Sequence, residues 1–326
     1  MNSERYLVTG SMGCIGAWVV RNLVQDGAVV TALDASQDDH RLKLIMTPPE
    51  LAQVRQVQSD ITDLDGLEKV VKDHGITHII HLAALQVPFC KANPALGARV
   101  NVVGTVNIFE VARRAALPQV VYASSVGVYG LSEEYPDGTA PENADPRPRS
   151  LYGVYKQANE GTARVFAWDY GIHSVGLRPY VVYGPGRDQG MTSGPTWAML
   201  AAAAGRPYRI SYCGRSGLNY VEDVARLFIR ASRATTGGAE VYNVRGSAVD
   251  MTEIVAAIEQ AAPQSAGQIS FAPNHLPLPE DIEDTRLRAA FPHLAVTPLA
   301  EGVARTIAHF RQALADGRVQ VENIPT

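Results

Sequence analysis

A turn with three glycines, placed where an apolar run meets a helical pattern, constrains the fold of this chain more than any other feature. The apolar run covers 6–9, the helical pattern covers 15–26, and the glycines are Gly10, Gly13 and Gly16. A strand, a turn free of side chains and a helix N-terminus together make a site for a dinucleotide pyrophosphate. The spacing G-x-x-G-x-x-G is one residue longer than the common dehydrogenase form, so its weight comes from this context.

Short β-rich runs alternate with helical stretches through the first half of the sequence. The pattern predicts helices over 15–26, 64–74, 94–116 and 152–170, and strands over 6–9, 29–34, 54–59, 78–82, 120–124 and 174–178. Alternation of this kind forms a parallel sheet with helices on both faces. The expected fold class is therefore α/β, a doubly wound Rossmann sheet with a smaller α/β substrate lobe.

Regular alternation stops after residue 178, and we expect an irregular lobe to follow. The stretch 184–219 is rich in Gly, Pro and Arg, and the elements that stand out later are a helix over 223–232, a strand over 240–244 and a helix over 298–315. We expect a dinucleotide-binding domain over 1–180 to which 219–246 returns, a substrate lobe over 181–218 and 247–315, and a tail over 316–326.

Two acidic residues at predicted strand ends indicate which dinucleotide binds. Asp34 ends the second strand, 18 positions after Gly16, where a carboxylate accepts from the ribose 2′-hydroxyl. The same carboxylate repels a 2′-phosphate and no Arg directly follows it, which favours NAD over NADP. Asp60 ends the third strand and can meet the adenine edge. Its alternative role is a helix N-cap, for which Asp63 or Thr62 is better placed.

A tyrosine and a lysine four residues apart predict a general base. Tyr152 and Lys156 share one face of the predicted helix over 152–170. A free phenol is a poor base at neutral pH, but a cation about 4 Å away contributes roughly 4 kcal/mol at an effective dielectric near 20, or about three pKa units. We therefore expect Lys156 to lower the pKa of Tyr152 into the range of a general base. Tyr155 is a competing tyrosine, but it is adjacent to Lys156 and points elsewhere.

A pair of serines closes the fifth predicted strand. Ligands of doubly wound sheets sit beyond the carboxyl ends of the strands, so a hydroxyl of Ser124 or Ser125 can hydrogen-bond a substrate alcohol there. Turn formation is the alternative role of a serine at such a position.

These residues carry a resemblance to the extended short-chain dehydrogenase/reductase family, the branch of NAD-dependent epimerases, dehydratases and sugar dehydrogenases. Matching segments occur in the family's order across 5–187: Thr9 to Gly16, Asp34, Asp60-Ile61, His81 to Ala84, Asn101 within Val100 to Thr105, Ser124-Ser125 with Tyr129-Gly130, Tyr152 to Lys156 with Glu160, and Leu177-Arg178-Pro179 with Tyr183-Gly184-Pro185.

The resemblance implies that Ser125, Tyr152 and Lys156 are catalytic and that NAD is the cofactor. The cofactor-binding residues that it implies are Gly10, Met12, Gly13, Cys14, Ile15, Gly16, Asp34, Asp60, Ile61, Leu82, Ala83, Ala84, Asn101, Tyr152, Lys156, Pro179 and Tyr180. It also implies a homodimer, in which the helices over 94–116 and 152–170 of two chains pack into a four-helix bundle.

Two positions depart from the family's nucleotide-sugar enzymes. Val181 stands where those enzymes usually carry an Asn. Ser216 stands where they carry an Arg that grips the pyrophosphate, although Arg215 is adjacent. A valine offers a pyrophosphate no hydrogen bond, so a smaller substrate is favoured over a UDP-sugar.

Polar residues near these positions are candidate substrate contacts. The stretch 184–219 holds Arg187, Arg206, Arg209 and Arg215 but a single acid, Asp188. Arginine forks suit carboxylates and phosphates, which indicates an anionic substrate; a solvated basic surface is the other interpretation. The substrate residues that we expect are Gln86, Ser125, Thr192, Ser193, Arg187 and Arg215.

Composition argues against several other classes of function. The chain has 46% hydrophobic residues and a net charge of −4, which describes a folded globule without a basic tract for nucleic acid. It has no long apolar run and no apolar leader, so we expect no membrane partner and a cytoplasmic location. Three cysteines far apart do not predict disulfides. His78 and His81 point to opposite faces of a strand, so no metal is expected.

Three functions remain, and the first is favoured. It is NAD-dependent oxidation of a secondary alcohol or hemiacetal in a small carbohydrate-like substrate, with or without an acidic group, with Tyr152 as the base. The second is an NAD-dependent sugar or nucleotide-sugar epimerase, which would not accumulate NADH. The third is a catalytically silent NAD-sensing protein, against which the Ser125, Tyr152 and Lys156 set argues.

Overall fold

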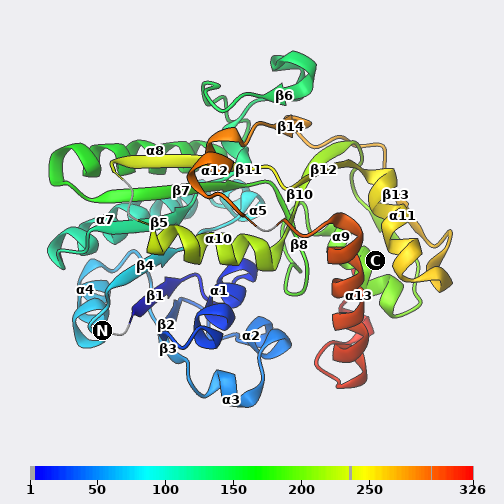
Figure 1. Cartoon of the computed structure of the whole chain (residues 1–326), viewed down its shortest axis with the longest axis horizontal. Coiled ribbons are helices and arrows are strands. Elements are labelled where there is room, and N and C mark those ends of the chain that lie inside the picture. Colours follow the sequence, from blue (N-terminus) through cyan, green and yellow to red (C-terminus); the bar gives the residue numbers. More distant parts are fainter. Residues whose placement is uncertain (1–3, 235–236, 295, 326) are drawn as a thin grey trace.

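The computed structural model describes residues 4–234, 237–294 and 296–325. The predicted domain segments also include residues 1–3, 235–236, 295 and 326, and these lie outside the described residues. Figure 1 shows a layered α/β body on one side and a group of helices and short strands on the other, with the N-terminus at the first and the C-terminus at the second.

Seven parallel strands form the central sheet, in the order β11-β7-β5-β4-β1-β2-β3. These strands are β1 (Arg5–Thr9), β2 (Val29–Asp34), β3 (Arg55–Gln58), β4 (His78–His81), β5 (Gln119–Ala123), β7 (His173–Pro179) and β11 (Ala239–Val244). The predicted parallel sheet is confirmed, and each bound differs from the predicted one by at most one residue.

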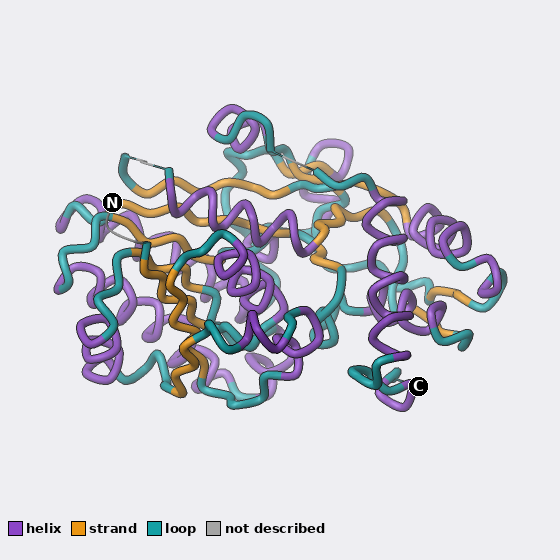
Figure 2. The backbone as a smooth tube through the Cα atoms, turned by 60° about the horizontal axis from the view of Figure 1, so that its bottom comes forward, coloured by secondary structure: helices purple, strands orange, loops and turns teal. Residues whose placement is uncertain are grey.

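Helices cover both faces of the sheet (Figures 1 and 2). Alternate side chains of β1 enter two different cores: Tyr6 and Val8 pack with α1 and α10, whereas Leu7 packs with α4, α7 and α8. Because side chains of a strand alternate between faces, this confirms the doubly wound arrangement. The helices are α1 (Cys14–Gln25), α4 (Leu64–Asp73), α7 (Gly104–Arg114), α8 (Leu151–Tyr170) and α10 (Val221–Arg233).

The predicted helix over 94–116 is not uniform. It consists of α6 (Pro94–Ala98), a π-helical stretch over Arg99–Val103 and α7, and α5 (Val87–Ala92) precedes it. Wider turns of this kind often occur at functional positions. Here the π-helical stretch carries Asn101, one of the predicted site residues.

The second group of elements comes mainly from the chain after β7. It contains a three-stranded sheet, β12-β10-β8, and the pairs β13-β9 and β14-β6. The helices α9, α11 and α13 pack against one another beside these strands (Figure 1). Their bounds are β6 (Thr139–Ala140), β8 (Val181–Tyr183), β9 (Tyr208–Ile210), β10 (Arg215–Tyr220), β12 (Ser247–Asp250), β13 (Ile269–Phe271), β14 (Asp281–Ile282), α9 (Gly194–Ala203), α11 (Met251–Ala261), α12 (Thr285–Ala290) and α13 (Leu299–Ala315).

The expectation of an irregular chain over 184–219 is wrong, because this stretch contains α9, β9 and most of β10. Eight of the ten residues of α9 are buried, so no polar face marks it as a helix in the sequence. The short helices α2 (His40–Ile45) and α3 (Pro48–Leu51) were also not predicted. Within the described parts of the chain, no helix combines the length and the apolar character needed to cross a bilayer.

Candidate active site

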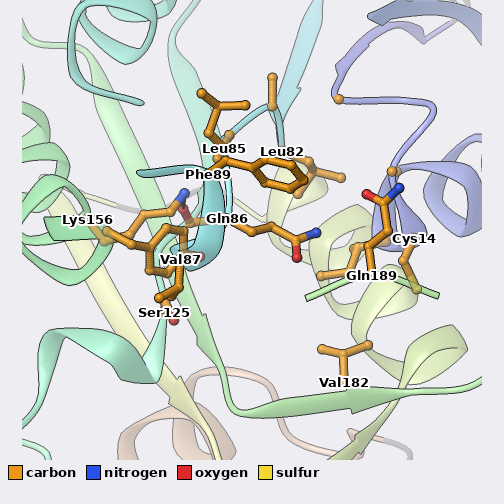
Figure 3. Close-up of a pocket in the computed structure, with 18 of the residues that line it drawn as sticks. Cys14, Leu82, Leu85, Gln86, Val87, Phe89, Ser125, Lys156, Val182 and Gln189 are labelled. Carbon is orange, nitrogen blue, oxygen red and sulfur yellow. Dashed lines mark hydrogen bonds between the residues drawn. The ribbon is translucent and has the colours of Figure 1, made fainter. Parts of the chain in front are cut away.

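A cavity of about 1040 Å³ opens at the carboxyl ends of the central strands. Its lining brings together the glycine turn, the Ser125–Tyr152–Lys156 set and part of the 184–193 loop. Figure 3 shows Lys156 and Ser125 on one side of the cavity, Cys14 and Gln189 on the other, and Gln86 between them. The predicted cofactor turn and the predicted catalytic residues therefore share one space.

The glycine turn fits a phosphate-bearing group because its backbone leaves no room for side chains. Gly10 has a φ of +69°, and a Cβ there would lie 2.5 Å from the amide nitrogen of Ala83. A Cβ on Gly16 would overlap the carbonyl oxygen of Gly10. Gly13 is the N-cap of α1, and among the described residues no side chain caps that helix end. The first-turn amides of α1 are thus left for a ligand, as pyrophosphate binding requires.

Asp34 ends β2 at the cavity wall, as predicted. Its Oδ2 accepts from the backbone amide of Met12 at 3.0 Å, and its Oδ1 accepts from the amide of Ser36 at 3.0 Å. These bonds fix the carboxylate beside the glycine turn, within reach of a ribose that follows the pyrophosphate.

Asp60 and Ile61 line the same end of the cavity. The N-cap of α4 is Asp63, whose Oδ1 accepts from the amide of Gly66 at 3.1 Å. The prediction that Asp60 is not this cap is confirmed, which leaves its carboxylate beside the cavity.

The segment after β4 forms a wall of the cavity, with Leu82, Ala83 and Ala84 in its lining. Asn101 does not reach the lining. It is 1% exposed, and its side-chain amide accepts from the Leu85 nitrogen at 2.7 Å and donates to the Leu85 oxygen at 2.9 Å. Asn101 therefore fixes the backbone of the wall from behind the lining, and a direct contact with the cofactor stays a prediction.

His78 and His81 have separate structural partners. The ring of His81 is hydrogen-bonded to the hydroxyls of Thr9 and Thr105 at 2.7 and 3.1 Å, and burial lowers its pKa to about 3. His78 stacks on Tyr6 with ring centroids 4.8 Å apart. Among the described residues, no group of three or more His, Cys, Asp or Glu side chains could hold a metal ion.

The predicted catalytic residues meet where α8 approaches the turn after β5. Ser150 caps α8 by accepting from the amide of Gly153 at 3.1 Å. Gly153 packs so closely on this turn that a Cβ there would overlap the carbonyl oxygen of Gly127. This approach places Tyr152 beside Ser125, since both side chains adjoin Gly127, and the Ser125 hydroxyl acts to lower the pKa of the phenol. The Ser125 Oγ also accepts from the Gly127 amide at 3.0 Å.

Lys156 lies one helical turn from Tyr152, but its ammonium is directed elsewhere. Its Nζ donates to the Ala123 oxygen at 2.7 Å and lies 5.6 Å from the centroid of the Tyr152 ring. Burial lowers the pKa of Lys156 to about 8. The pKa of Tyr152 is raised, because burial outweighs the Ser125 hydroxyl and the charge of Arg187, which lower it. The prediction that Lys156 lowers the Tyr152 pKa is therefore wrong for this structure.

Two competing hydroxyls already have partners within the protein. Tyr155 donates its hydroxyl to the Pro94 oxygen at 2.9 Å, as expected for a side chain that points elsewhere. Ser124 is 2% exposed and donates to Glu160 Oε1 at 2.5 Å. Ser125 and Tyr152 are therefore the hydroxyls best placed to meet a substrate.

A buried ion pair supports this part of the site. Arg178 donates from Nε and Nη2 to the two carboxylate oxygens of Glu160 at 2.7 and 2.6 Å, and both residues are buried. Its Nη1 donates to the Tyr129 hydroxyl at 2.6 Å, which in turn donates to Asn243 at 2.8 Å. The network ties α8 to β7 and β11. The sequence motifs include these residues, but only their burial reveals the pairing.

Three predicted substrate residues, Gln86, Arg187 and Thr192, line the large cavity. The Nη2 of Arg187 donates to the Thr192 hydroxyl at 3.0 Å. The two positions where nucleotide-sugar enzymes grip a pyrophosphate lie outside this lining, since Val181 is 0% and Ser216 is 1% exposed.

Two other predicted substrate residues stay outside the large cavity. Ser193 is buried, and its hydroxyl donates to the Gly190 oxygen at 2.9 Å, so it shapes the turn before α9. Arg215 lines a separate cavity of about 440 Å³ and lies 3.6 Å from the carboxylate of Asp281. The packing of β10 against β12 and β8 places Arg215 there.

An ion pair that sequence reasoning missed joins the two sides of the large cavity. Arg41 of α2 contacts Asp188 of the 184–193 loop, with Nη2 at 2.5 Å from Oδ1. The Nη1 of Arg41 donates to the Met12 oxygen at 2.7 Å, and His40 is hydrogen-bonded to Asp188 at 2.8 Å. We call the Arg41–Asp188 pair the clasp. Its partners are 147 residues apart, so no local pattern could reveal it.

A model of the NAD-dependent epimerase/dehydratase family matches residues 6–244. The chain belongs to this family. It is an enzyme of the extended short-chain dehydrogenase/reductase type with NAD as its cofactor, so the predicted family, fold and cofactor are confirmed.

Relatives that span nearly the whole chain include both epimerases and dehydrogenases. UDP-glucose 4-epimerase of Mycolicibacterium smegmatis is 33% identical over 316 residues, which cover 94% of this chain and 98% of that protein. The crystal structure of Thermus thermophilus UDP-glucose 4-epimerase with NAD has a TM-score of 0.80 at 29% identity and covers 95% of this chain and 99% of that chain. A holo L-threonine dehydrogenase from Cupriavidus necator has a TM-score of 0.81 at 25% identity, with coverage of 93% and 99%.

Proposed function

We propose that this enzyme is an NAD-dependent dehydrogenase that oxidises a secondary alcohol or hemiacetal of a small carbohydrate-like substrate. The observation that carries the proposal is that Ser125, Tyr152 and Lys156 line the same cavity as the glycine turn. A dehydrogenase must hold the dinucleotide and remove a hydroxyl proton. We propose that both tasks are carried out in this one cavity.

NAD, when bound, would supply the acceptor for the hydride of the substrate carbon. Tyr152 takes the proton of the hydroxyl on that carbon, and Ser125 donates a hydrogen bond to the same oxygen. Because burial raises the pKa of Tyr152, the phenol needs nearby positive charge to act as a base. Arg187 supplies part of that charge, and the ammonium of Lys156 supplies more when it turns from the Ala123 oxygen toward the phenol.

The cofactor contacts that we propose are the predicted residues that line the cavity. They comprise the glycine turn with Met12, Cys14 and Ile15 for the pyrophosphate, Asp34 for the ribose, Asp60 and Ile61 for the adenine, and Leu82, Ala83, Ala84, Pro179 and Tyr180 with Lys156 for the nicotinamide end.

We also propose a cytoplasmic homodimer that pairs the helices at 94–114 and 151–170. Support comes from large apolar side chains that these helices leave exposed, namely Leu96, Val103, Val154, Val165 and Trp168. An apolar patch of this kind is typical of a protein interface. Sedimentation of the purified enzyme measures this state directly.

An epimerase is the second candidate, favoured by the similarity to the mycobacterial UDP-glucose 4-epimerase. The burial of Val181 and Ser216 weighs against it, because neither position can grip a nucleotide diphosphate. The likeness to an L-threonine dehydrogenase supports the interpretation that this fold can serve a small substrate.

NADH formation separates these candidates. The purified enzyme is incubated with NAD and a panel of sugars, sugar acids, polyols and UDP-sugars, and absorbance of NADH is followed. We expect NADH to accumulate with one class of alcohol and Tyr152→Phe to slow its formation by a factor of about 10²–10⁴. Tyr155→Phe is the matched control and keeps activity. Interconversion of UDP-sugars without net NADH contradicts the proposal and supports the epimerase.

A further inference from the structure

We propose that Arg187, with Gln86 and Thr192, forms a subsite for a substrate carboxylate, so that the enzyme oxidises a hydroxy acid. This inference rests on the proposed dehydrogenase function and names its substrate class. The subsite lies where the 184–193 loop meets the wall that follows β4.

Arg187 is a cation that lacks an anion. Its Nε is buried without a hydrogen-bond partner, and its Nη2 donates only to the neutral hydroxyl of Thr192. Across the described ranges of the chain, no acidic side chain pairs with it, and the adjacent Asp188 is held by Arg41 and His40. Arg187 is partly buried, and a cation withdrawn from water in this way is stabilised when an anion pairs with it. The cavity beside it is where that anion can enter.

Gln86 provides a second unsatisfied group at the same place. Its Oε1 is buried without a partner. Gln86 and Arg187 both adjoin Gly190, since a Cβ on that residue would overlap Gln86 Oε1 and lie 3.3 Å from Arg187 Nη2. If the side-chain amide of Gln86 is rotated by half a turn, its nitrogen takes the place of its oxygen and offers a hydrogen-bond donor at this point. The guanidinium, the amide and the Thr192 hydroxyl can therefore donate together to one planar carboxylate.

The subsite faces the reacting groups. The charge of Arg187 is close enough to Tyr152 to lower its pKa, and Ser125 lines the same cavity. A small acid bound to Arg187 can therefore place a hydroxyl at Tyr152. Longer substrates such as nucleotide diphosphates would need grips further away, where Val181 and Ser216 offer none.

The number of unpaired cations in the lining of the large cavity favours a carboxylate over a phosphate as the bound group. Of the other cations that line the cavity, Arg41 and Arg149 are paired with carboxylates, Lys156 donates to a carbonyl, and Lys91 is exposed. Among the described residues of this lining, Arg187 is thus a partly buried cation that neither a carboxylate nor a backbone carbonyl engages. One charge balances a carboxylate, whereas a phosphate ester carries close to two at neutral pH.

The test compares three matched substrates that differ at one position: a sugar acid, the neutral sugar with a hydroxymethyl group there, and the sugar phosphate. The readout is kcat/KM from NADH formation. We expect the wild type to prefer the acid, and Arg187→Met to lower the ratio of acid to neutral sugar by roughly 10- to 100-fold. Arg187→Lys should restore part of this ratio. Arg209→Met, which changes an exposed arginine of the same stretch, should leave the ratio unchanged.

The possible failures are distinguishable. Equal use of acid and neutral sugar, with a ratio that Arg187→Met does not alter, overturns the subsite while the dehydrogenase function stands. Preference for the sugar phosphate overturns the carboxylate assignment. If no alcohol yields NADH, the proposed function fails, and calorimetric titration of the sugar acid into the enzyme–NAD complex still decides the subsite. Binding that Arg187→Met abolishes supports it, and binding that the variant retains refutes it.

Discussion

The burial of Lys156 leads to a prediction whose size can be worked out. The side chain is 3% exposed, and burial lowers its pKa from 10.5 to about 8. In the unfolded chain the lysine keeps its ordinary pKa near 10.4. Between pH 8 and about 10.5, therefore, the unfolded state binds a proton that the native state lacks, and the free energy of unfolding rises with pH. At about 1.4 kcal/mol per pH unit, the contribution of Lys156 grows by about 3 kcal/mol across this window.

The assay is chemical denaturation of the cofactor-free enzyme at a series of pH values from about 7.5 to 10.5. Lys156→Met keeps a long side chain without a titrating group, so the difference between wild type and variant isolates Lys156. We expect the wild type to gain about 3 kcal/mol in free energy of unfolding relative to the variant as pH rises through the window.

The thiol of Cys90 also titrates near Lys156, so its contribution to the pH dependence must be separated from that of Lys156. Burial raises the pKa of its thiol, and the charge of Lys156 lowers it. The same comparison in a Cys90→Ser background removes this contribution. A difference curve that stays flat with pH in both backgrounds would refute the reasoning, because it would mean that Lys156 keeps an ordinary pKa in the folded chain.

Two further predictions concern the buried ion pair and the clasp. Glu160→Gln leaves Arg178 buried without its carboxylate, and we expect the free energy of unfolding in urea to fall by about 3–5 kcal/mol, against less than about 1 kcal/mol for the exposed control Glu301→Gln. A small loss at Glu160 would show that the pair is not effectively buried. Asp188→Asn removes the charge of the clasp, and we expect NADH to leave about tenfold faster in stopped-flow fluorescence; an unchanged rate would show that the clasp does not retain the cofactor.

The central sheet could be predicted from the sequence because its signals are local. Short β-rich runs, helical stretches and the glycine turn placed every strand of the sheet to within one residue. α9 could not be predicted, since it is apolar on nearly all sides and shows no periodicity. Its helical state follows from burial against α11 and α13, which depends on the folded arrangement.

The same division applies to the site. The spacing of Tyr152 and Lys156 identified the pair, but the direction of the Tyr152 pKa shift was wrong, because it depends on burial and on the Ala123 oxygen that attracts the ammonium. Sequence grouped four arginines as one basic stretch. The structure separates them: Arg206 and Arg209 are exposed, Arg215 lies near Asp281, and Arg187 enters the large cavity.

The two halves of the site rest on supports of different stiffness. Ser125, Tyr152 and Lys156 sit on a strand end and a helix that the buried network of Glu160 holds. Arg187 sits on a loop with three glycines at positive φ. The loop is tied to α2 through its neighbour Asp188 and to α1 through the bond from Trp18 to the Pro185 oxygen. Arg187 of the proposed substrate subsite and Asp188 of the clasp are consecutive residues. Release of the clasp therefore displaces Arg187 together with Asp188. Asp188→Asn should consequently raise the KM for the acid substrate along with the rate of NADH release, and a change in one without the other would show that the loop does not move as a unit.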